Sequence, residues 1–308
     1  MILHIGAHRT ATSSLQLFLA RNRAALVSKG ALYPYRSRRH LKLFNEILRR
    51  ERSIDEVSAE LNQLADDAEG EIDTIILSDE DVCARSPLVL RVLSGFKKHF
   101  DVTVVYTMRR QDLWLESWYF QNIKWQWQDD LAHGNFDEFM SKSDQFSWID
   151  YDRFLGTLEK MFGKDKVVPI VFERGQMQGG PIHTFLDRIG LTDREGFESP
   201  PYINPSYSPL ESEFMRQLPL DKADTEYRNI LIRLFEHIDK AARKAKPSSL
   251  LLDREAREEV MARFAEGNRK VARRYFGRDE LFLDNLPASD KPLAVTSLPA
   301  RSIPVAVM

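Results

Sequence analysis

The chain has 308 residues, 43% of them hydrophobic, which is enough for a packed core in one large or two small domains. Its net charge is −2, so it lacks the basic excess that is typical of nucleic-acid-binding proteins. The single cysteine, Cys83, excludes a disulfide within the chain and a cysteine-rich metal site. No signal-peptide pattern opens the sequence and no apolar run reaches ~18 residues, so we expect a cytoplasmic protein without membrane insertion.

The chain opens with an apolar strand, Met1–Ile5, which leads into a short loop and an amphipathic helix. Gly6 can make the sharp turn after the strand, and Arg9 adds a fixed positive charge. Free N–H groups and the positive end of the helix dipole make such a turn an anion site. We therefore interpret the loop as a cradle for phosphate or sulfate; an ordinary strand–helix turn with a threonine N-cap is the alternative. The residues of this cradle are Arg9, Thr10, Ala11, Thr12, Ser13 and Ser14.

Short apolar strands then alternate with helical segments along the chain. This alternation predicts a three-layer α/β fold of the P-loop nucleotide-hydrolase-like class, with a mainly parallel central sheet, flanking helices and a helical C-terminal part. We expect one domain over residues 1–286 and an extended or disordered tail over 287–308, where prolines recur without a period. The predicted strands are 2–5, 74–77, 102–108 and 167–172. The predicted helices are 12–28, 40–50, 54–68, 88–99, 111–126, 151–162, 182–189, 208–218, 227–245 and 254–276.

Charged side chains follow two of the later strands. Asp79 and Glu80 come directly after strand 74–77, and Arg109 follows strand 102–108, with Ser117 in the next helix. Ligands of open α/β sheets bind at the carboxyl ends of the strands, where these residues lie. A guanidinium at such a place suits a phosphate because it pairs bidentately with the oxygens. A solvated arginine and acidic residues that cap the next helix would give the same pattern.

The order of these motifs resembles that of the sulfotransferases. Their phosphosulfate-binding loop is usually written K-x-G-T-T; here Arg9 stands for the lysine, Ala11 for the glycine, and Thr12 and Ser13 for the hydroxyl pair. In the family, an arginine at a strand end and a helix serine clasp the 3′-phosphate of the donor, and the spacing of Arg109 and Ser117 is similar. The stretch 151–190 resembles a block of bacterial sulfotransferase-like proteins. The resemblance implies 3′-phosphoadenosine 5′-phosphosulfate (PAPS) as co-substrate and no metal.

Sulfuryl transfer to a hydroxyl or amine also needs a general base. The Ser-x-Glu pattern at residues 78–80 resembles family members in which the glutamate is the base, so Glu80 is the first candidate and Asp79 the alternative. His8 is a third candidate because it lies within the loop. Arg9 would serve as an electrostatic clamp, since an arginine does not readily donate its proton.

The acceptor side is less marked in the sequence. Trp114, Trp118 and Trp125 share one side of a helix, with Trp127 pointing roughly the other way, and such a stripe occurs both in cores and in sugar platforms. Trp125 is our acceptor candidate because it lies near the helix end. His40 is a weaker one, because family members carry a histidine near the cleft. Together with the family resemblance, these residues favour a carbohydrate or glycolipid acceptor.

Two other functions fit the same motifs. One is a non-catalytic binding protein with the sulfotransferase fold. The other is a P-loop kinase or nucleoside triphosphatase with a degenerate loop, although the G-K-[ST] lysine and a clear set of magnesium ligands are missing. The oligomeric state does not follow from the sequence.

Overall fold

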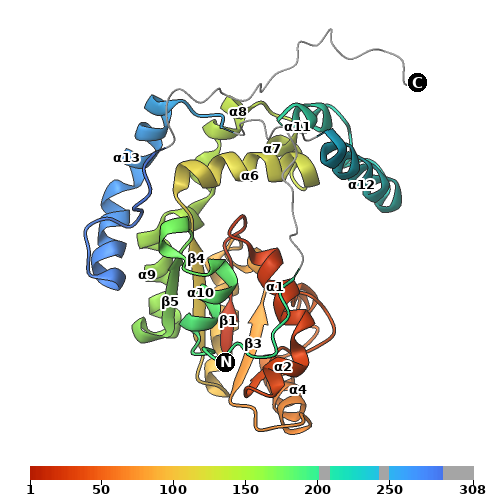
Figure 1. Cartoon of the computed structure of the whole chain (residues 1–308), viewed down its shortest axis with the longest axis vertical. Helices are drawn as coiled ribbons and strands as arrows, with labels where there is room; N and C mark the ends of the chain where they lie inside the picture. The colour runs from red at the N-terminus through yellow and green to blue at the C-terminus, as the bar shows by residue number, and fades with distance from the viewer. Residues whose placement is uncertain (201–208, 243–249, 287–308) are drawn as a thin grey trace. The chain divides into compact units, whose positions relative to one another are not determined.

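Five short strands form one parallel sheet, in the order β2-β3-β1-β4-β5, in the computed structural model (Figure 1). The structure describes residues 1–200, 209–242 and 250–286. In the central strands Ile2 lies opposite Ile76 of β3 and Thr103 of β4, so the three carboxyl ends reach one edge of the sheet. The strands are β1 (Ile2–His4), β2 (Ala31–Leu32), β3 (Thr74–Ser78), β4 (Thr103–Met108) and β5 (Val167–Val171).

The described residues group into two compact units. The first, which we call the sheet unit, comprises residues 1–110, 146–200 and 265–284; the second, the helical unit, comprises 111–145, 209–242, 250–264 and 285–286. The single domain expected over residues 1–286 stays a prediction. The tail expected over 287–308 lies outside the described residues.

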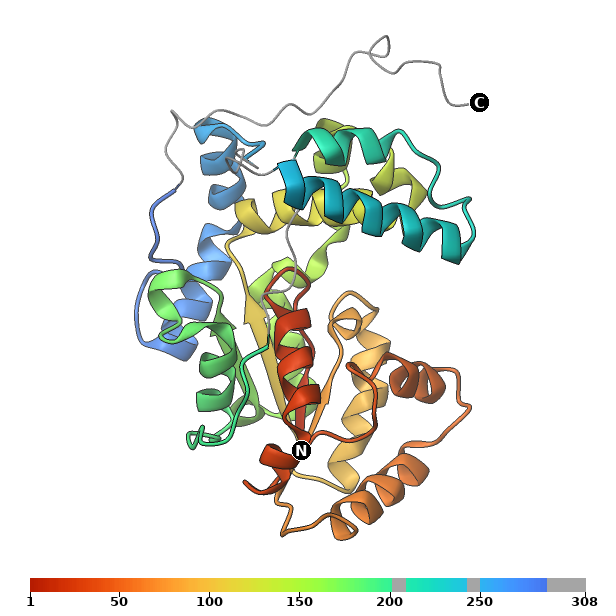
Figure 2. The same cartoon turned by 45° about the vertical axis from the view of Figure 1, so that its right-hand side comes forward.

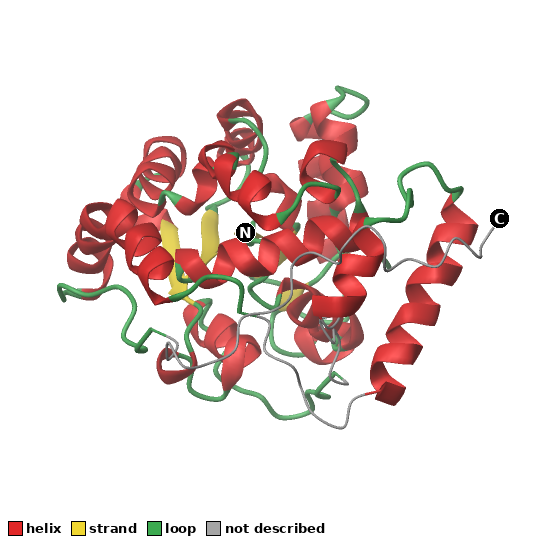
Figure 3. Cartoon of the chain, turned by 90° about the horizontal axis from the view of Figure 1, so that it is seen from above, coloured by secondary structure: helices red, strands yellow, loops and turns green. Residues whose placement is uncertain are grey.

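Helices make up most of both units (Figure 3). The sheet unit holds α1 (Thr12–Arg21), α2 (Arg23–Val27), α3 (Leu41–Leu48), α4 (Ile54–Asp66), α5 (Pro87–Leu93), α9 (Tyr151–Phe162) and α10 (Gly180–Arg188). The helical unit holds α6 (Gln111–Trp125), α7 (Asp129–Ala132), α8 (Phe136–Ser141), α11 (Pro209–Arg216) and α12 (Thr225–Ala242). Helix α13 (Arg254–Val271) begins in the helical unit and continues into the sheet unit, where a π turn, Ala272–Phe276, follows.

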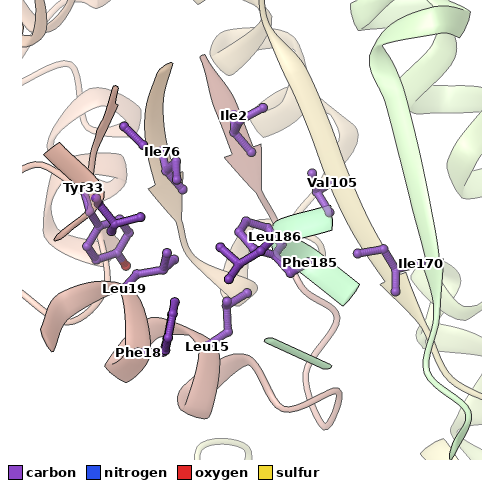
Figure 4. Packing of buried hydrophobic residues seen from close by; sticks show 12 residues of the cluster. Ile2, Leu15, Phe18, Leu19, Tyr33, Ile76, Val105, Ile170, Phe185 and Leu186 are labelled. Atoms are coloured by element: carbon purple, nitrogen blue, oxygen red, sulfur yellow. The ribbon is translucent and has the colours of Figure 1, made fainter. Parts of the chain in front are cut away.

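The core of the sheet unit follows from the alternation of side chains along the strands. Val105 points to the face covered by α1 and α10, where it joins Ile2 and Ile76 (Figure 4). The next residue, Tyr106, points the other way and packs on Phe154 of α9, with ring centroids 4.7 Å apart. Helices therefore cover both faces of the sheet, and α1 runs alongside the strands in Figure 2.

This architecture confirms the predicted fold class, whereas several of the predicted local elements differ. Strand β2 was not predicted, because two residues are too short to show a period. The helix predicted over residues 12–28 is broken at Asn22, whose side-chain amide donates to the Phe18 and Glu198 carbonyl oxygens at 2.8 and 3.0 Å. Within the described residues, no helix combines the length and apolar character that a membrane span needs.

Candidate functional site

The carboxyl ends of β1, β3 and β4 carry the polar side chains singled out in the sequence. The loop 5–11 follows β1, the turn Asp79–Asp81 follows β3, and Arg109 follows β4. From β1 the chain passes to β2 and β3 on one side of it, and from β3 it then crosses to β4 on the other side, so the strand order reverses at β1. Such a topological switch point is where open α/β sheets bind their ligands.

The loop after β1 has a strained, closely packed backbone. Its first part continues beside β4, with the Ile5 and Ala7 N–H groups donating to the Val105 and Thr107 carbonyl oxygens at 3.1 and 3.2 Å. Gly6 has a φ of 92°, and a Cβ there would lie 2.8 Å from the Cβ of Glu80. Only glycine fits this approach, so the loop rests directly on the turn after β3.

Two further loop residues adopt positive φ values, Arg9 at 66° and Ala11 at 62°. Non-glycine residues in this region cost about 1–2 kcal/mol each, and such strain is common at ligand sites. The Thr10 hydroxyl donates to the Ala7 carbonyl oxygen at 2.6 Å and so holds the loop shape. The Thr10 hydroxyl is therefore occupied by a hydrogen bond within the loop. Ser13 and Ser14 lie half-buried in the first turn of α1.

The N-cap residue of α1 provides no side-chain cap. Its N-cap residue is Ala11, which has no side-chain acceptor, and the first turn, beginning at Thr12, carries no acidic residue. The positive end of this helix is therefore directed at the loop without a compensating carboxylate in its own turn.

A second positive charge reaches the loop from β4. The Arg109 guanidinium donates from Nη1 to the carbonyl oxygen of Arg9 at 2.9 Å. Burial, together with the smaller effect of the Arg109 charge, lowers the pKa of Arg9 to about 10. Two neighbouring guanidinium groups repel each other, so an anion between them would be stabilised. The structure thus brings Arg9 and Arg109 together, as the sequence predicted.

The turn after β3 carries three carboxylates around one guanidinium. Arg39 places Nη1 3.3 Å from Glu80 Oε1, Nη2 3.2 Å from Asp81 Oδ2, and Nε 3.7 Å from Asp79 Oδ2. Glu80 also accepts a hydrogen bond of 2.5 Å from Gln16 Nε2 of α1. Sequence reasoning missed Gln16. It placed Arg39 only in a basic run that could face an anionic acceptor but is more typical of a solvated surface; the run comprises Arg36, Arg38, Arg39, His40 and Lys42.

Each of the three base candidates occupies a different environment in this cluster. His8 places Nε2 3.2 Å from Asp81 Oδ1. Burial would raise the pKa of Asp81, but the hydrogen bond from His8 and the charge of Arg39 hold it below its ordinary value. Asp79 is fully buried, and burial raises its pKa to about 7. Glu80 is 6% exposed and shares its two oxygens between Gln16 and Arg39.

A small pocket lies beside the loop, within the sheet unit. One wall is formed by loop and α1 residues, the opposite wall by residues from β5 to α10, and most of the lining is apolar. The lining residues are His4, Thr10, Ala11, Leu15, Thr107, Ile170, Met177, Pro181 and Phe185.

A segment close to the C-terminal end of the described residues binds the same edge of the sheet. Glu173, just after β5, accepts a hydrogen bond from the Leu283 N–H at 2.7 Å, and Arg110 donates to the Asp284 carbonyl oxygen at 2.9 Å. Gln176 donates to the Leu281 carbonyl oxygen at 3.0 Å. We call residues 277–284 the C-terminal strap. It was not predicted, because its partners are far apart in the sequence.

His40 does not reach the loop. It is 1% exposed; its Nδ1 accepts from the Ser78 N–H and its Nε2 donates to the Pro34 carbonyl oxygen, both at 3.0 Å. Burial lowers its pKa to about 4. Both ring nitrogens are used by the backbone, so the predicted substrate contact is replaced by a structural role that joins β3 to the segment before α3.

Ser117 and Trp125 belong to the helical unit, so their predicted places beside Arg109 and the acceptor stay predictions. The indole of Trp125 stacks on Trp127, with ring centroids 6.0 Å apart and planes 5° from parallel. Trp127 also contacts Trp118, contrary to the prediction that it points away, because α6 ends at Trp125 and Gln126 reverses the chain with a φ of 44°.

Comparisons with known proteins leave the family open. No family model matches the chain. A protein of Archaeoglobus fulgidus named only "Uncharacterized protein" is 27% identical over 196 residues, which cover 61% of this chain; the match spans half of that protein's length. A crystal structure of a sulfotransferase from Alicyclobacillus acidocaldarius is similar over 88% of this chain and 93% of its own, with 15% identity and a TM-score of 0.44. A likeness this distant does not extend to an activity.

Proposed function

We propose that the chain is a PAPS-dependent sulfotransferase that transfers a sulfuryl group to a hydroxyl or amine. One observation carries the proposal: Arg109 binds the backbone of Arg9, beside the uncapped N-terminus of α1, at the switch point of the sheet. Two guanidinium groups and a helix N-terminus around one loop favour a ligand with more than one anionic group. The donor carries a 5′-phosphosulfate and a 3′-phosphate and matches this need.

In the transfer, the acceptor oxygen forms a bond to sulfur while the bond from sulfur to the phosphate oxygen breaks. The acceptor proton goes to a base, and negative charge builds on the leaving phosphate. Arg9, Thr12 and the N–H groups that begin α1 would stabilise that charge, because they are fixed before the reaction starts. No residue has to be a metal ligand for this chemistry.

We favour His8 as the base over Glu80, the first choice from the sequence. Both carboxylate oxygens of Glu80 already accept hydrogen bonds, one from Gln16 and one from the cation Arg39, so neither is directed at an acceptor. His8 lies on the loop itself, and its imidazole faces Asp81, a carboxylate that can hold the ring in one orientation. Asp79 is fully buried, which denies it contact with an acceptor. Glu80 then acts as a positioning residue under Gly6.

The acceptor that we propose is a carbohydrate hydroxyl, free or on a glycolipid. The stacked pair Trp125 and Trp127, of which Trp127 is 52% exposed, offers an aromatic face of the kind on which sugar rings stack. A screen of glycans against a Trp127→Ala variant tests this part separately.

The donor site is tested by calorimetric titration with 3′-phosphoadenosine 5′-phosphate, the desulfated donor. We expect micromolar binding by the wild-type chain and about a tenfold or greater loss in Arg109→Ala, since a bidentate phosphate contact is worth about 1–3 kcal/mol. Arg36→Ala, which removes an exposed arginine of the sheet unit, is the matched control and should bind as the wild type does. Equal affinity in both variants would remove Arg109 from the site.

Magnesium-ATP titrated in parallel tests the kinase or triphosphatase alternative. Preference for magnesium-ATP over the bisphosphate would overturn the sulfotransferase proposal. Binding of the bisphosphate without turnover on any acceptor would favour the non-catalytic binding protein.

The base is tested by pH profiles of kcat/KM once an acceptor is known. His8→Asn should lower kcat by about 100-fold or more and abolish the acidic limb of the profile. Glu80→Gln should lower activity less and keep that limb. If Glu80→Gln instead loses the limb while His8→Asn keeps it, Glu80 is the base.

A further inference from the structure

Three potential metal ligands meet in the helical unit. They are Asp129 at the start of α7, His133 just after its end, and Asp221 in the turn between α11 and α12. Helices α6, α7 and α11 lie together in Figure 1. One ligand atom from each residue lies within 4.8 Å of the others. We propose that these three side chains form a binding site for a divalent metal ion of the zinc class.

The distances between the ligand atoms are those of a metal-bridged arrangement and are longer than direct hydrogen bonds. His133 Nε2 is 3.4 Å from Asp129 Oδ1 and 3.4 Å from Asp221 Oδ1. A charge-assisted N–H···O bond is normally about 2.7–2.9 Å long, so both contacts are too long for one. Two ligand atoms bound to Zn²⁺ at about 2.1 Å and at a tetrahedral angle lie about 3.4 Å apart, which is the spacing found here.

The imidazole is held in the orientation that a metal ligand needs. His133 Nδ1 donates to the Arg216 carbonyl oxygen at 2.8 Å, and in the neutral ring this leaves the lone pair on Nε2, directed at the two carboxylates. Arg216 in turn donates from Nη1 to the His133 carbonyl oxygen at 2.5 Å. This reciprocal pair fixes His133 on the C-terminal end of α11 before any ion binds.

The backbone that carries the second carboxylate, that of Asp221, is also held by a residue outside the cluster. The Asp221 N–H donates to Gln126 Oε1 at 3.0 Å. The amide nitrogen of Gln126 donates to the Met215 and Leu218 carbonyl oxygens at 2.9 Å each. These backbone hydrogen bonds position the turn 219–221. The side chain of Asp221 takes no part in them and stays available for an ion.

The donor set selects the class of ion. One neutral imidazole and two carboxylates carry a charge of about −2, which one divalent cation neutralises, and they leave a coordination position for water. Mg²⁺ and Ca²⁺ prefer oxygen ligands only, so Zn²⁺ and similar ions are favoured. A bound ion would join α7 to the turn before α12, which lie far apart in the sequence.

The test is calorimetric titration of the tag-free, chelator-treated full-length chain with ZnCl₂, followed by Co²⁺ titration in the visible range. We expect one Zn²⁺ per chain and the intense absorption of tetrahedral Co²⁺. Asp129→Asn and Asp221→Asn, which change exposed side chains and spare the backbone contacts, should each weaken Zn²⁺ binding about tenfold or more.

Two matched controls separate this site from incidental binding. Asp130→Asn alters the adjacent carboxylate, which pairs with Lys142, and His99→Gln alters a histidine that faces one carboxylate only, Asp55. Both controls should keep the wild-type affinity and the Co²⁺ spectrum. Absence of saturable Zn²⁺ binding, or equal affinity in the Asp129, Asp221 and control variants, would overturn the proposal.

Discussion

Replacing Gly6 with alanine should damage the loop after β1 more than any conservative change elsewhere in the sheet unit. The new Cβ would lie 2.8 Å from Glu80 Cβ and 3.0 Å from Glu80 Cα, and neither atom is the end of a flexible side chain. The φ of 92° adds about 1–2 kcal/mol, and forcing the two segments apart adds about 1–3 kcal/mol. We therefore expect Gly6→Ala to lower the free energy of unfolding by about 2–5 kcal/mol.

Urea unfolding followed by circular dichroism measures this loss, and titration with the desulfated donor shows whether the anion site is lost with it. Gly156→Ala is the matched control, because Gly156 lies inside α9 and a Cβ there meets nothing within 4 Å. This control should be stabilised by about 0.5–1 kcal/mol through helix propensity. A Gly6→Ala chain with wild-type stability and wild-type affinity would refute the close approach of the loop to Glu80.

Three more substitutions have defined outcomes. Burial raises the pKa of Asp79 from 3.8 to about 7, so between these pH values the folded state keeps a proton that the unfolded state has lost. The free energy of unfolding should therefore fall as the pH rises through this window, by at most about 4 kcal/mol. Urea midpoints measured across the window for Asp79→Asn should lack that fall. Arg257→Ala should destabilise the helical unit by about 3–5 kcal/mol in thermal unfolding, because the buried Glu116, 2.5 Å from Arg257 Nη2, loses its cation; a loss under 1 kcal/mol would contradict this. Glu173→Ala should release the C-terminal strap, seen as faster hydrogen exchange at the Leu283 amide, and unchanged exchange there would speak against the strap.

The strands and most helices could be predicted because their patterns are local. Strands β1, β3, β4 and β5 consist of apolar runs, and α4 and α9 show a clear helical period. The break at Asn22 could not be predicted, since it depends on a hydrogen bond to the Glu198 carbonyl oxygen, far along the chain. Helix α6 ends as predicted within one residue, but the reversal at Gln126 depends on partners in α11 and the turn after it.

The sequence could predict where the candidate site lies, but it could predict only some of the residues that form it. Loops that follow parallel strands meet at one edge, so Arg9 and Arg109 could be expected to meet. Arg39 could not be distinguished from its neighbours in the basic run, because only the fold shows which of them faces the acidic turn. His40 was misjudged for the same reason, because only the fold shows that both ring nitrogens of this histidine, which precedes α3, bind backbone groups.

The contact between the loop and the acidic turn has a consequence for how this protein could change. Gly6 rests on Glu80, and His8 is paired with Asp81, so two stretches that are far apart in the sequence share one packing arrangement. Substitutions in contact with each other do not contribute additively. Epistasis should therefore be concentrated here: a library that varies Glu80 or Asp81 alone will contain few active members, and improved variants will carry compensating changes within residues 6–8.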